Sequence, residues 1–269
     1  MSLAEPDGYD QVRTIVCDLD GVLYVDSEPV PGAGEALERL QSDGYDLLFV
    51  TNNATRTPAM VVANIAQRTG FVTTADRVVT SPQAVAHYLK ENQLDDCFVI
   101  GEDGLRETLR YSGLRLVEDW REAKTVVTGL DRSVTYRRFA DATLAIRHGA
   151  QFICTNLDPT YPTPAGLQPG GGAIAALVEV AAGVTPVSCG KPAAPIRDLI
   201  ASRLAPGQVV VVGDRMDTDI AMATAQGWFG ALVLSGSTDA SSAPAPTPRM
   251  LVLDSIADLP GELRRRCAI

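Results

Sequence analysis

Short apolar runs rich in β-branched residues alternate with helical stretches along this chain, and this alternation constrains its fold more than any other feature. Residues 12–17 form the first such run, and residues 31–42 follow with apolar side chains at helical spacing. The pattern repeats, with strands predicted at 46–50 and 77–80 around a predicted helix at 58–69. Alternation of this kind is typical of parallel βαβ units. The sequence therefore predicts an α/β fold built on a parallel sheet.

A second region of similar character begins after a predicted helix at 82–91. Its predicted strands and helices are 97–100, 104–112, 125–128, 135–148 and 151–154. A strand at 208–212 then resumes the first pattern, and residues 237–249, rich in Ser, Ala and Pro, are expected to form a surface loop. We therefore predict a core made from residues 1–88 and 185–269, with an α/β domain of residues 89–184 inserted into it.

Composition limits the partners that this chain can have. Its formal net charge of -10 opposes binding to nucleic acids and to anionic membranes, so neither partner is expected. Five scattered cysteines without Cys-x-x-Cys spacing indicate neither a disulfide framework nor a zinc site. Residues 1–10 are polar and acidic, and no stretch approaches the roughly 18 apolar residues that a membrane span needs. We expect a cytoplasmic protein.

Two carboxylates follow the first predicted strand. Residues 12–17 end directly in Asp18-Leu19-Asp20-Gly21, at the strand end where open parallel sheets usually bind their ligands. An isolated Asp-x-Asp-Gly segment is also an ordinary turn capped by acids. This motif alone leaves both interpretations open.

Polar residues also follow the second predicted strand and stand near the end of the inserted region. Thr51, Asn52 and Asn53 offer a hydroxyl, amides and backbone N–H groups that suit phosphate oxygens, although Asn-rich turns are common. Lys191 lies between a glycine and a proline, which fixes its backbone direction, although a surface lysine is the more common case.

A group of acids follows the predicted strand at 208–212. Asp214 ends that strand, and Asp217 and Asp219 come within the next five residues. Three acids in this position indicate a site for a hard cation, and Mg²⁺ fits because it takes oxygen ligands and commonly bridges carboxylates to phosphate. For Asp217 and Thr218, capping of the following helix is an equally open interpretation.

Taken together, these four elements resemble the four motifs of the haloacid dehalogenase (HAD) superfamily of phosphatases, in the same order and at strand ends throughout. Residues 18–21 resemble the first motif, Thr51 and Asn52 the second, Lys191 the third, and residues 213–219 the fourth. The resemblance implies a Rossmann-like parallel-sheet core with an inserted α/β cap domain.

The inserted region is similar to the cap of the NagD-like branch, which includes 4-nitrophenyl phosphate, glycerol phosphate, phosphoglycolate, nucleotide and pyridoxal phosphate phosphatases. The similar stretches are 129–131, 155–158 and 169–172. The glycines at 170–172 are not followed by the Gly-Lys-Ser/Thr of a nucleotide-binding phosphate loop. The resemblance therefore implies that residues 89–184 select the substrate.

The resemblance also implies a mechanism with Mg²⁺ as cofactor. Asp18 would be the nucleophile that forms an aspartyl-phosphate, and Asp20 the general acid and base. The carboxylates of Asp18 and Asp214 and the backbone carbonyl of Asp20 would hold Mg²⁺, while Asp219 would orient Lys191 or a metal-bound water. Asp217 is not assigned a role.

In the same comparison, Lys191 and Thr51 would bind the phosphate, with help from Asn52 and, in a lesser role, Asn53. Four cap residues are candidates for contact with the leaving group: Asp131, Arg132, Tyr161 and Pro162. Tyr136 is a further candidate, and Tyr161 is equally suited to packing within the cap. Relatives that prefer pyridoxal phosphate often have a histidine at this place, so glycerol 3-phosphate or phosphoglycolate is favoured.

Two other functions are compatible with parts of this pattern. A HAD-type phosphomutase would share the aspartyl-phosphate, but its cap generally lies elsewhere and is helical. A catalytically idle small-molecule binding protein would not need both leading aspartates, Asp18 and Asp20. We therefore expect a Mg²⁺-dependent phosphatase whose partner is a small phosphorylated metabolite. Because caps of this branch often mediate homodimers, a homodimer through the cap is a further expectation.

Overall fold

The computed structural model describes residues 8–25, 28–163 and 165–267, so most of the polar leading segment lies outside the described residues. The chain forms two compact units. The first unit comprises residues 1–51, 61–78 and 200–269, and the second unit comprises residues 52–60 and 79–199. The domain boundaries expected from the sequence, at 88/89 and 184/185, divide the chain at different places and stay a prediction.

A six-stranded sheet forms the centre of the first unit, in the order β15-β14-β13-β1-β4-β5. Its strands are β1 (Val12–Cys17), β4 (Asp46–Thr51), β5 (Val78–Thr80), β13 (Gln208–Gly213), β14 (Phe229–Val233) and β15 (Met250–Leu253). β1 runs parallel to both of its neighbours, with Cys17 beside Phe49 of β4 and Val212 of β13. The predicted parallel-sheet α/β fold is confirmed.

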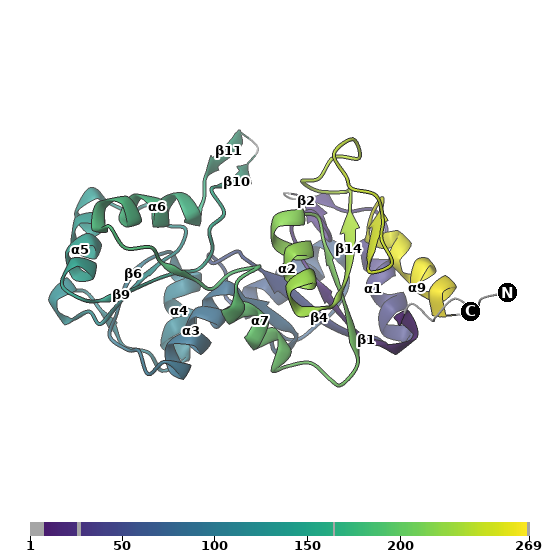
Figure 1. Ribbon diagram of the computed structural model, residues 1–269, viewed down its shortest axis with the longest axis horizontal. Coiled ribbons are helices and arrows are strands. Elements are labelled where there is room, and N and C mark those ends of the chain that lie inside the picture. Colours follow the sequence, from purple (N-terminus) through teal and green to yellow (C-terminus); the bar gives the residue numbers. More distant parts are fainter. Residues whose placement is uncertain (1–7, 26–27, 164, 268–269) are drawn as a thin grey trace. The chain divides into compact units, whose positions relative to one another are not determined.

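Helices of the first unit bury the faces of this sheet. They are α1 (Ala33–Ser42), α2 (Pro58–Thr69), α8 (Ala221–Gln226) and α9 (Leu259–Cys267), and α1 and α9 pack side by side (Figure 1). Leu37 and Leu40 of α1 join Phe49 and Val210 of the strands in one core. β13 is buried over almost its whole length, as expected for a parallel strand covered on both faces. Shorter elements are β2 (Tyr24–Val25), β3 (Glu28–Pro29), the 3₁₀ turns Tyr9–Gln11, Ala75–Arg77 and Ile256–Asp258, and the π-helical turn Met216–Ile220.

The second unit has its own parallel sheet, in the order β12-β9-β8-β6-β7. Its strands are β6 (Cys97–Ile100), β7 (Leu116–Val117), β8 (Thr125–Thr128), β9 (Gln151–Cys154) and β12 (Val187–Ser188). Its helices are α3 (Ser81–Glu91), α4 (Asp103–Tyr111), α5 (Tyr136–Arg147), α6 (Gly171–Ala182) and α7 (Ala194–Ala201), with a 3₁₀ turn at Trp120–Glu122. The three long strands predicted in this region are confirmed.

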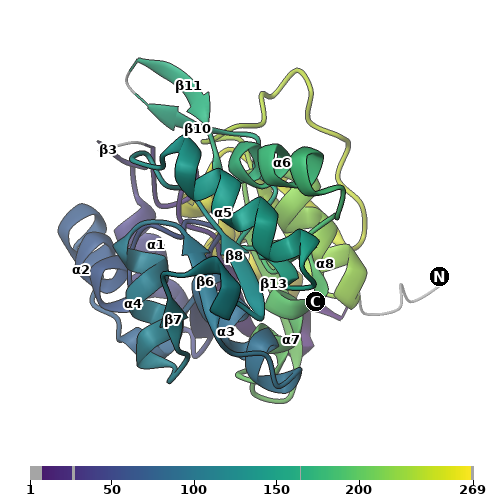
Figure 2. The same cartoon turned by 90° about the vertical axis from the view of Figure 1, so that its left-hand side faces the viewer.

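The strand order of this second sheet reverses at β6. The chain passes from β6 to β7 on one side and then to β8 on the other. Because crossovers between parallel strands are right-handed, α4 and α5 must leave the sheet on opposite faces. α5 packs with α6 over Phe98, Val126 and Phe152, whereas α4 packs with α3 (Figure 2). The loops after β6 and β8 therefore diverge, and this is where open α/β sheets bind ligands.

An antiparallel hairpin that the sequence did not predict extends from the second unit. It consists of β10 (Thr160–Thr163) and β11 (Gly166–Pro169), and most of its residues are exposed (Figure 1). The glycine run after it begins α6. A Cβ at Gly172 would lie 2.3 Å from the carbonyl oxygen of Leu157, so this glycine allows close backbone packing. Among the described residues, no helix is long and apolar enough to cross a membrane.

Candidate active site

Three carboxylates meet at the carboxyl edge of the first unit's sheet. Asp18 follows β1, Asp214 follows β13, and Asp219 comes from the turn after β13; one oxygen of each lies within 4.8 Å of the others. We call these three residues the carboxylate cluster. They are 9%, 3% and 0% exposed, and the backbone N–H of Asp18 donates to the carbonyl of Val212 at 2.9 Å. Buried oxygen ligands this close together suit a hard divalent cation.

Two glycines make room for the Asp214 side chain. A Cβ at Gly21 would lie 2.3 Å from an oxygen of that carboxylate, and a Cβ at Gly236 would lie 2.2 Å from it. The backbone N–H of Ser237 donates to the same carboxylate at 2.6 Å, and the Thr238 hydroxyl donates to the Asp214 carbonyl at 2.5 Å. Asp214 is therefore held by close backbone contacts on several sides.

The segment that holds Asp214 was missed by the sequence analysis, which treated residues 237–249 only as a surface loop. Ser235 also belongs to this segment, because its hydroxyl donates to the carbonyl of Gly21 at 2.7 Å. The available signal was the run of small residues Ser235-Gly236-Ser237-Thr238 soon after the apolar run 229–234. The small residues therefore follow β14 (Phe229–Val233), which is the neighbour of β13 in the sheet.

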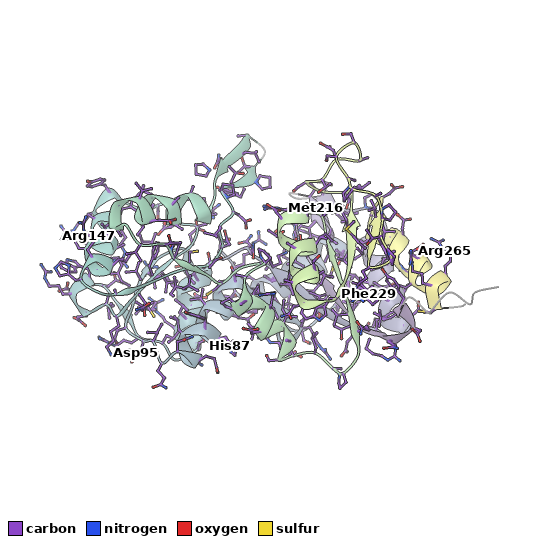
Figure 3. All side chains as sticks on the ribbon, in the orientation of Figure 1. His87, Asp95, Arg147, Met216, Phe229 and Arg265 are labelled. Atoms are coloured by element: carbon purple, nitrogen blue, oxygen red, sulfur yellow. The ribbon has the colours of Figure 1, made fainter. Side chains whose placement is uncertain are left out.

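A π-helical turn positions Asp219. This turn spans Met216–Ile220 and opens with the part-exposed Met216 (Figure 3). A Cβ at Gly213 would lie 2.2 Å from the Cβ of Asp219, so the strand end and the turn pack without a side chain between them. The Thr218 hydroxyl donates to the Asp219 carboxylate at 3.1 Å. Turns of this kind recur at functional sites.

Asp217 lies outside the carboxylate cluster. Its carboxylate forms two hydrogen bonds with the Arg215 guanidinium, at 2.8 and 3.0 Å, and these bonds lower the pKa of Asp217. Its side chain is largely exposed. The N-caps of the π turn and of α8 carry no side-chain capping bond, so the capping interpretation of Asp217 and Thr218 finds no support.

Asp20 is exposed, two residues beyond Asp18. The turn that follows is closed by a hydrogen bond from the N–H of Gly21 to the carbonyl of Tyr24 at 2.8 Å. The carboxylate of Asp20 is not part of the carboxylate cluster. An exposed carboxyl group beside a buried one suits an exchange of protons with water, whereas Asp18 is shielded.

Thr51 ends β4 and is 2% exposed, and because β4 runs parallel to β1, Thr51 leaves the same edge of the sheet as Asp18. Asn53 forms an ordinary Asx turn, in which its side-chain oxygen accepts bonds from the N–H and hydroxyl of Thr55 at 2.9 and 2.8 Å. Thr51 thus lies at the end of the second predicted strand, and its role in phosphate binding stays a prediction, while the side-chain oxygen of Asn53 accepts the hydrogen bonds of its own turn.

In the second unit, the side chain of Asn52 holds the backbone of Lys191. Its oxygen accepts a bond from the Lys191 N–H at 2.7 Å, and its amide nitrogen donates to the Lys191 carbonyl at 3.3 Å and to Asp158 at 3.0 Å. Lys191 is 5% exposed. The structure therefore gives Asn52 a positioning contact with Lys191 that the motif alone did not reveal.

The leaving-group candidates of the second unit have defined partners. Asp131 accepts bonds from the N–H and hydroxyl of Ser133 at 3.0 and 2.9 Å, as in an ordinary turn. Arg132 pairs with Glu102, which sequence reasoning missed, and the Tyr161 hydroxyl donates to Gln168 at 3.0 Å. Pro162 and Tyr136 are exposed.

Two protein-family models match the parts of the chain that contain these residues. The model of the family described as haloacid dehalogenase-like hydrolase matches residues 15–115, and that described as HAD-hydrolase-like matches residues 188–259. The 5'-nucleotidase YutF of Bacillus subtilis is 38% identical over 82% of this chain and 86% of its own length. An acid sugar phosphatase of Staphylococcus haemolyticus is 38% identical over 76% of this chain and 78% of its own length.

Solved structures are similar as well. A glycerol phosphate phosphatase from Mycobacterium tuberculosis, determined in complex with magnesium, shares 34% identity at a TM-score of 0.84, covering 94% of this chain and 78% of that one. A p-nitrophenyl phosphatase from Archaeoglobus fulgidus shares 29% identity at a TM-score of 0.86, covering 94% of this chain and 99% of that one.

Proposed function

The chain belongs to the haloacid dehalogenase-like hydrolases and is a phosphoric monoester hydrolase of their NagD-like branch. From this we propose that it uses Mg²⁺ and the carboxylate of Asp18 to hydrolyse small polyol and sugar phosphates. Glycerol 3-phosphate is the first candidate substrate. The observation that carries the proposal is the carboxylate cluster at the ends of β1 and β13. Its nucleophile candidate and its cation ligands come from the two central strands of one sheet.

The residues present fit Mg²⁺. The cluster offers carboxylate oxygens only, which a hard cation prefers over nitrogen or sulfur ligands. We assign Asp18 and Asp214 as ligands through their carboxylates and Asp20 through its backbone carbonyl. Asp219 lies close enough to orient a ligand or to join them. Bound Mg²⁺ supplies positive charge that offsets the repulsion between these carboxylates and a phosphate dianion.

The reaction then follows from the chain's own groups. An Asp18 carboxylate oxygen attacks phosphorus in line, and the bond from phosphorus to the leaving alkoxide breaks, giving an aspartyl-phosphate. Asp20 protonates the departing alkoxide, then takes a proton from the water that attacks phosphorus and releases phosphate from Asp18. Lys191 and Thr51 bind the equatorial oxygens as charge moves onto them.

We propose that the second unit acts as the cap and that Asp131, Arg132, Tyr161 and Pro162 contact the leaving group. What supports small polyol and sugar phosphates is that two similar proteins carry the names acid sugar phosphatase and glycerol phosphate phosphatase. The name 5'-nucleotidase on another relative makes nucleoside monophosphates the next candidates.

We also propose a cytoplasmic enzyme that forms a homodimer through its cap and binds neither nucleic acid nor membrane. Five scattered cysteines without Cys-x-x-Cys spacing suit a reducing compartment, and the net charge of -10 disfavours binding to nucleic acid and to anionic membranes. Sedimentation analysis of the native chain would test the dimer, and a monomer at all concentrations would refute it.

The first experiment measures phosphate release from glycerol 3-phosphate, sugar phosphates, phosphoglycolate, 4-nitrophenyl phosphate, pyridoxal phosphate and nucleoside monophosphates. Native protein is assayed in Mg²⁺ and in chelator, beside Asp18→Asn in Mg²⁺. We expect Mg²⁺-dependent release that Asp18→Asn abolishes. Release that persists in Asp18→Asn would refute the nucleophile, and no release at all would favour the phosphomutase or the idle binding protein.

A further inference from the structure

Glu102 and Arg132 lie where the strand order of the second sheet reverses. Glu102 follows β6 and Arg132 follows β8, and these strands are direct neighbours. Because α4 and α5 leave on opposite faces, the loops that carry these two residues diverge at the carboxyl edge of the sheet. Open α/β sheets bind their ligands at this position.

The two side chains form a two-pronged ion pair. Nε of Arg132 donates to Oε1 of Glu102 and Nη2 donates to Oε2, both at 2.7 Å. The Arg132 backbone N–H also donates to Oε1, at 3.2 Å. The side chain of Arg132 is 60% exposed, whereas that of Glu102 is 20% exposed. The fork of the guanidinium is thus already occupied by a carboxylate, and the pair carries no net charge.

The charge of Arg132 is compensated, and the exposed hairpin of the same unit carries neutral polar side chains. Hydrogen bonding to the Glu102 carboxylate raises the pKa of Arg132. The Tyr161 hydroxyl donates to the side-chain oxygen of Gln168 at 3.0 Å. These segments of the second unit therefore present hydroxyl, amide and guanidinium groups, and the guanidinium of Arg132 is compensated by Glu102.

We propose that Glu102 determines the charge selectivity of the enzyme, so that phosphate esters of neutral, hydroxylated leaving groups such as glycerol are preferred over those whose leaving group carries a carboxylate. This inference rests on the proposed function, in which Arg132 and Tyr161 contact the leaving group. A carboxylate on the substrate must compete with Glu102 for the guanidinium and is repelled by it. A polyol hydroxyl needs only a donor or acceptor and leaves the pair intact.

Glu102→Gln tests this directly, because it keeps the shape and a hydrogen-bonding oxygen but removes the negative charge. The measurement is kcat/KM for phosphoglycolate divided by kcat/KM for glycerol 3-phosphate. We expect this ratio to rise about tenfold or more, chiefly through a lower KM for phosphoglycolate. Glu102→Asp should keep the ratio nearer to that of the native enzyme, because it retains the charge.

Two further variants make the result specific. Glu107→Gln removes one negative charge from an exposed position on α4, the helix that follows Glu102, and should leave the ratio within about twofold of native. Arg132→Gln leaves the Glu102 carboxylate without its guanidinium, and the ratio should fall. If Glu102→Gln does not fold, the opposite shift in Arg132→Gln still tests the inference.

The two levels of the proposal fail in different ways. An unchanged ratio in a folded, active Glu102→Gln, or an equal rise in Glu107→Gln, overturns the role of Glu102 and leaves the phosphatase intact. A native protein that releases phosphate from no ester overturns the proposed function itself. A native ratio that already favours phosphoglycolate also contradicts the inference.

Discussion

The carboxylate cluster of the first unit and the Glu102–Arg132 pair of the second stand in corresponding places, each at the ends of adjacent strands of a parallel sheet, yet they are held in opposite ways. Backbone groups and missing Cβ atoms hold Asp214, and the cluster is buried. The Glu102 carboxylate orients Arg132, whose side chain is mostly exposed. In the proposed function, the carboxylates assigned to the chemistry are therefore fixed by close backbone packing, whereas the residues assigned to selectivity are fixed by an ion pair between side chains.

The carboxylate cluster and the Glu102–Arg132 pair also differ in their electrostatic energies. Buried carboxylates are costly to keep close together, so a change at the cluster should act on cation binding and on rate. An exposed ion pair is typically worth about 0 to 1 kcal/mol, because solvent screens it. Substitution at Glu102 should therefore change which substrate is preferred with little effect on folding.

The largest effect is expected from Asp214→Asn. It keeps the acceptor for the Ser237 N–H but removes a cation-binding charge, so kcat/KM should fall about 10²- to 10³-fold. Added Mg²⁺ should also raise the melting temperature of the native chain by more than that of the variant. A cation that binds the folded state stabilises that state, and the variant should bind Mg²⁺ more weakly. Equal Mg²⁺ shifts in both proteins would remove Asp214 from the cation site.

Gly21→Ala and Gly113→Ala compare the two units at matched backbone geometry. Both glycines have positive φ, 81° and 83°, so alanine strains either by about 1 to 2 kcal/mol. A Cβ meets Asp214 at Gly21 and nothing within 4 Å at Gly113. Only Gly21→Ala should therefore lower kcat, by about 10²-fold, in a steady-state assay. Similar losses in both variants would mean that strain, not crowding of Asp214, is responsible.

Hydrogen bonds around Asp214 should have a smaller effect. Ser235→Ala and Thr238→Val each remove one bond of about 1 kcal/mol from the segment that holds Asp214 and Gly21. We expect Mg²⁺ affinity, measured by calorimetry, to weaken about two- to tenfold in each. Ser242→Ala is the matched control. The Ser242 hydroxyl donates to the Asp239 carbonyl at 3.0 Å, and this exposed hydrogen bond does not involve Asp214 or Gly21. Weakening in the control to the same extent would contradict the assignment.

In the first unit, local sequence patterns predict the bounds of strands and helices better than they predict the contacts between them. Strand β1 was predicted to the residue, because an apolar run bounded by polar residues is a local signal. The helix predicted at 31–42 begins at Ala33, because Gly32 adopts a left-handed conformation with φ of 78°. Asp18 and Asp214 could be paired in advance only through the family resemblance, since their proximity depends on the β1–β13 ladder.

What the sequence could not predict depends on contacts between distant segments. Glu102 and Arg132 are 30 residues apart and meet only because β6 and β8 are neighbours. The β10–β11 hairpin is mostly exposed, so it lacks the alternation of apolar and polar residues that marks a half-buried strand. Neither feature leaves a periodic trace in the chain.

The smallest effect concerns the contribution of the Glu102–Arg132 pair to stability. Hydrogen bonding to Arg132 holds the pKa of Glu102 below its ordinary value of 4.5, so the pair stabilises the fold above that value and loses this contribution as pH falls through the lowered pKa. At neutral pH, Glu102→Gln should cost at most about 1 kcal/mol in urea unfolding, and the difference should shrink in molar salt and below pH 4. A larger, salt-independent cost would show that the pair supports the fold, and would break the contrast with the buried cluster.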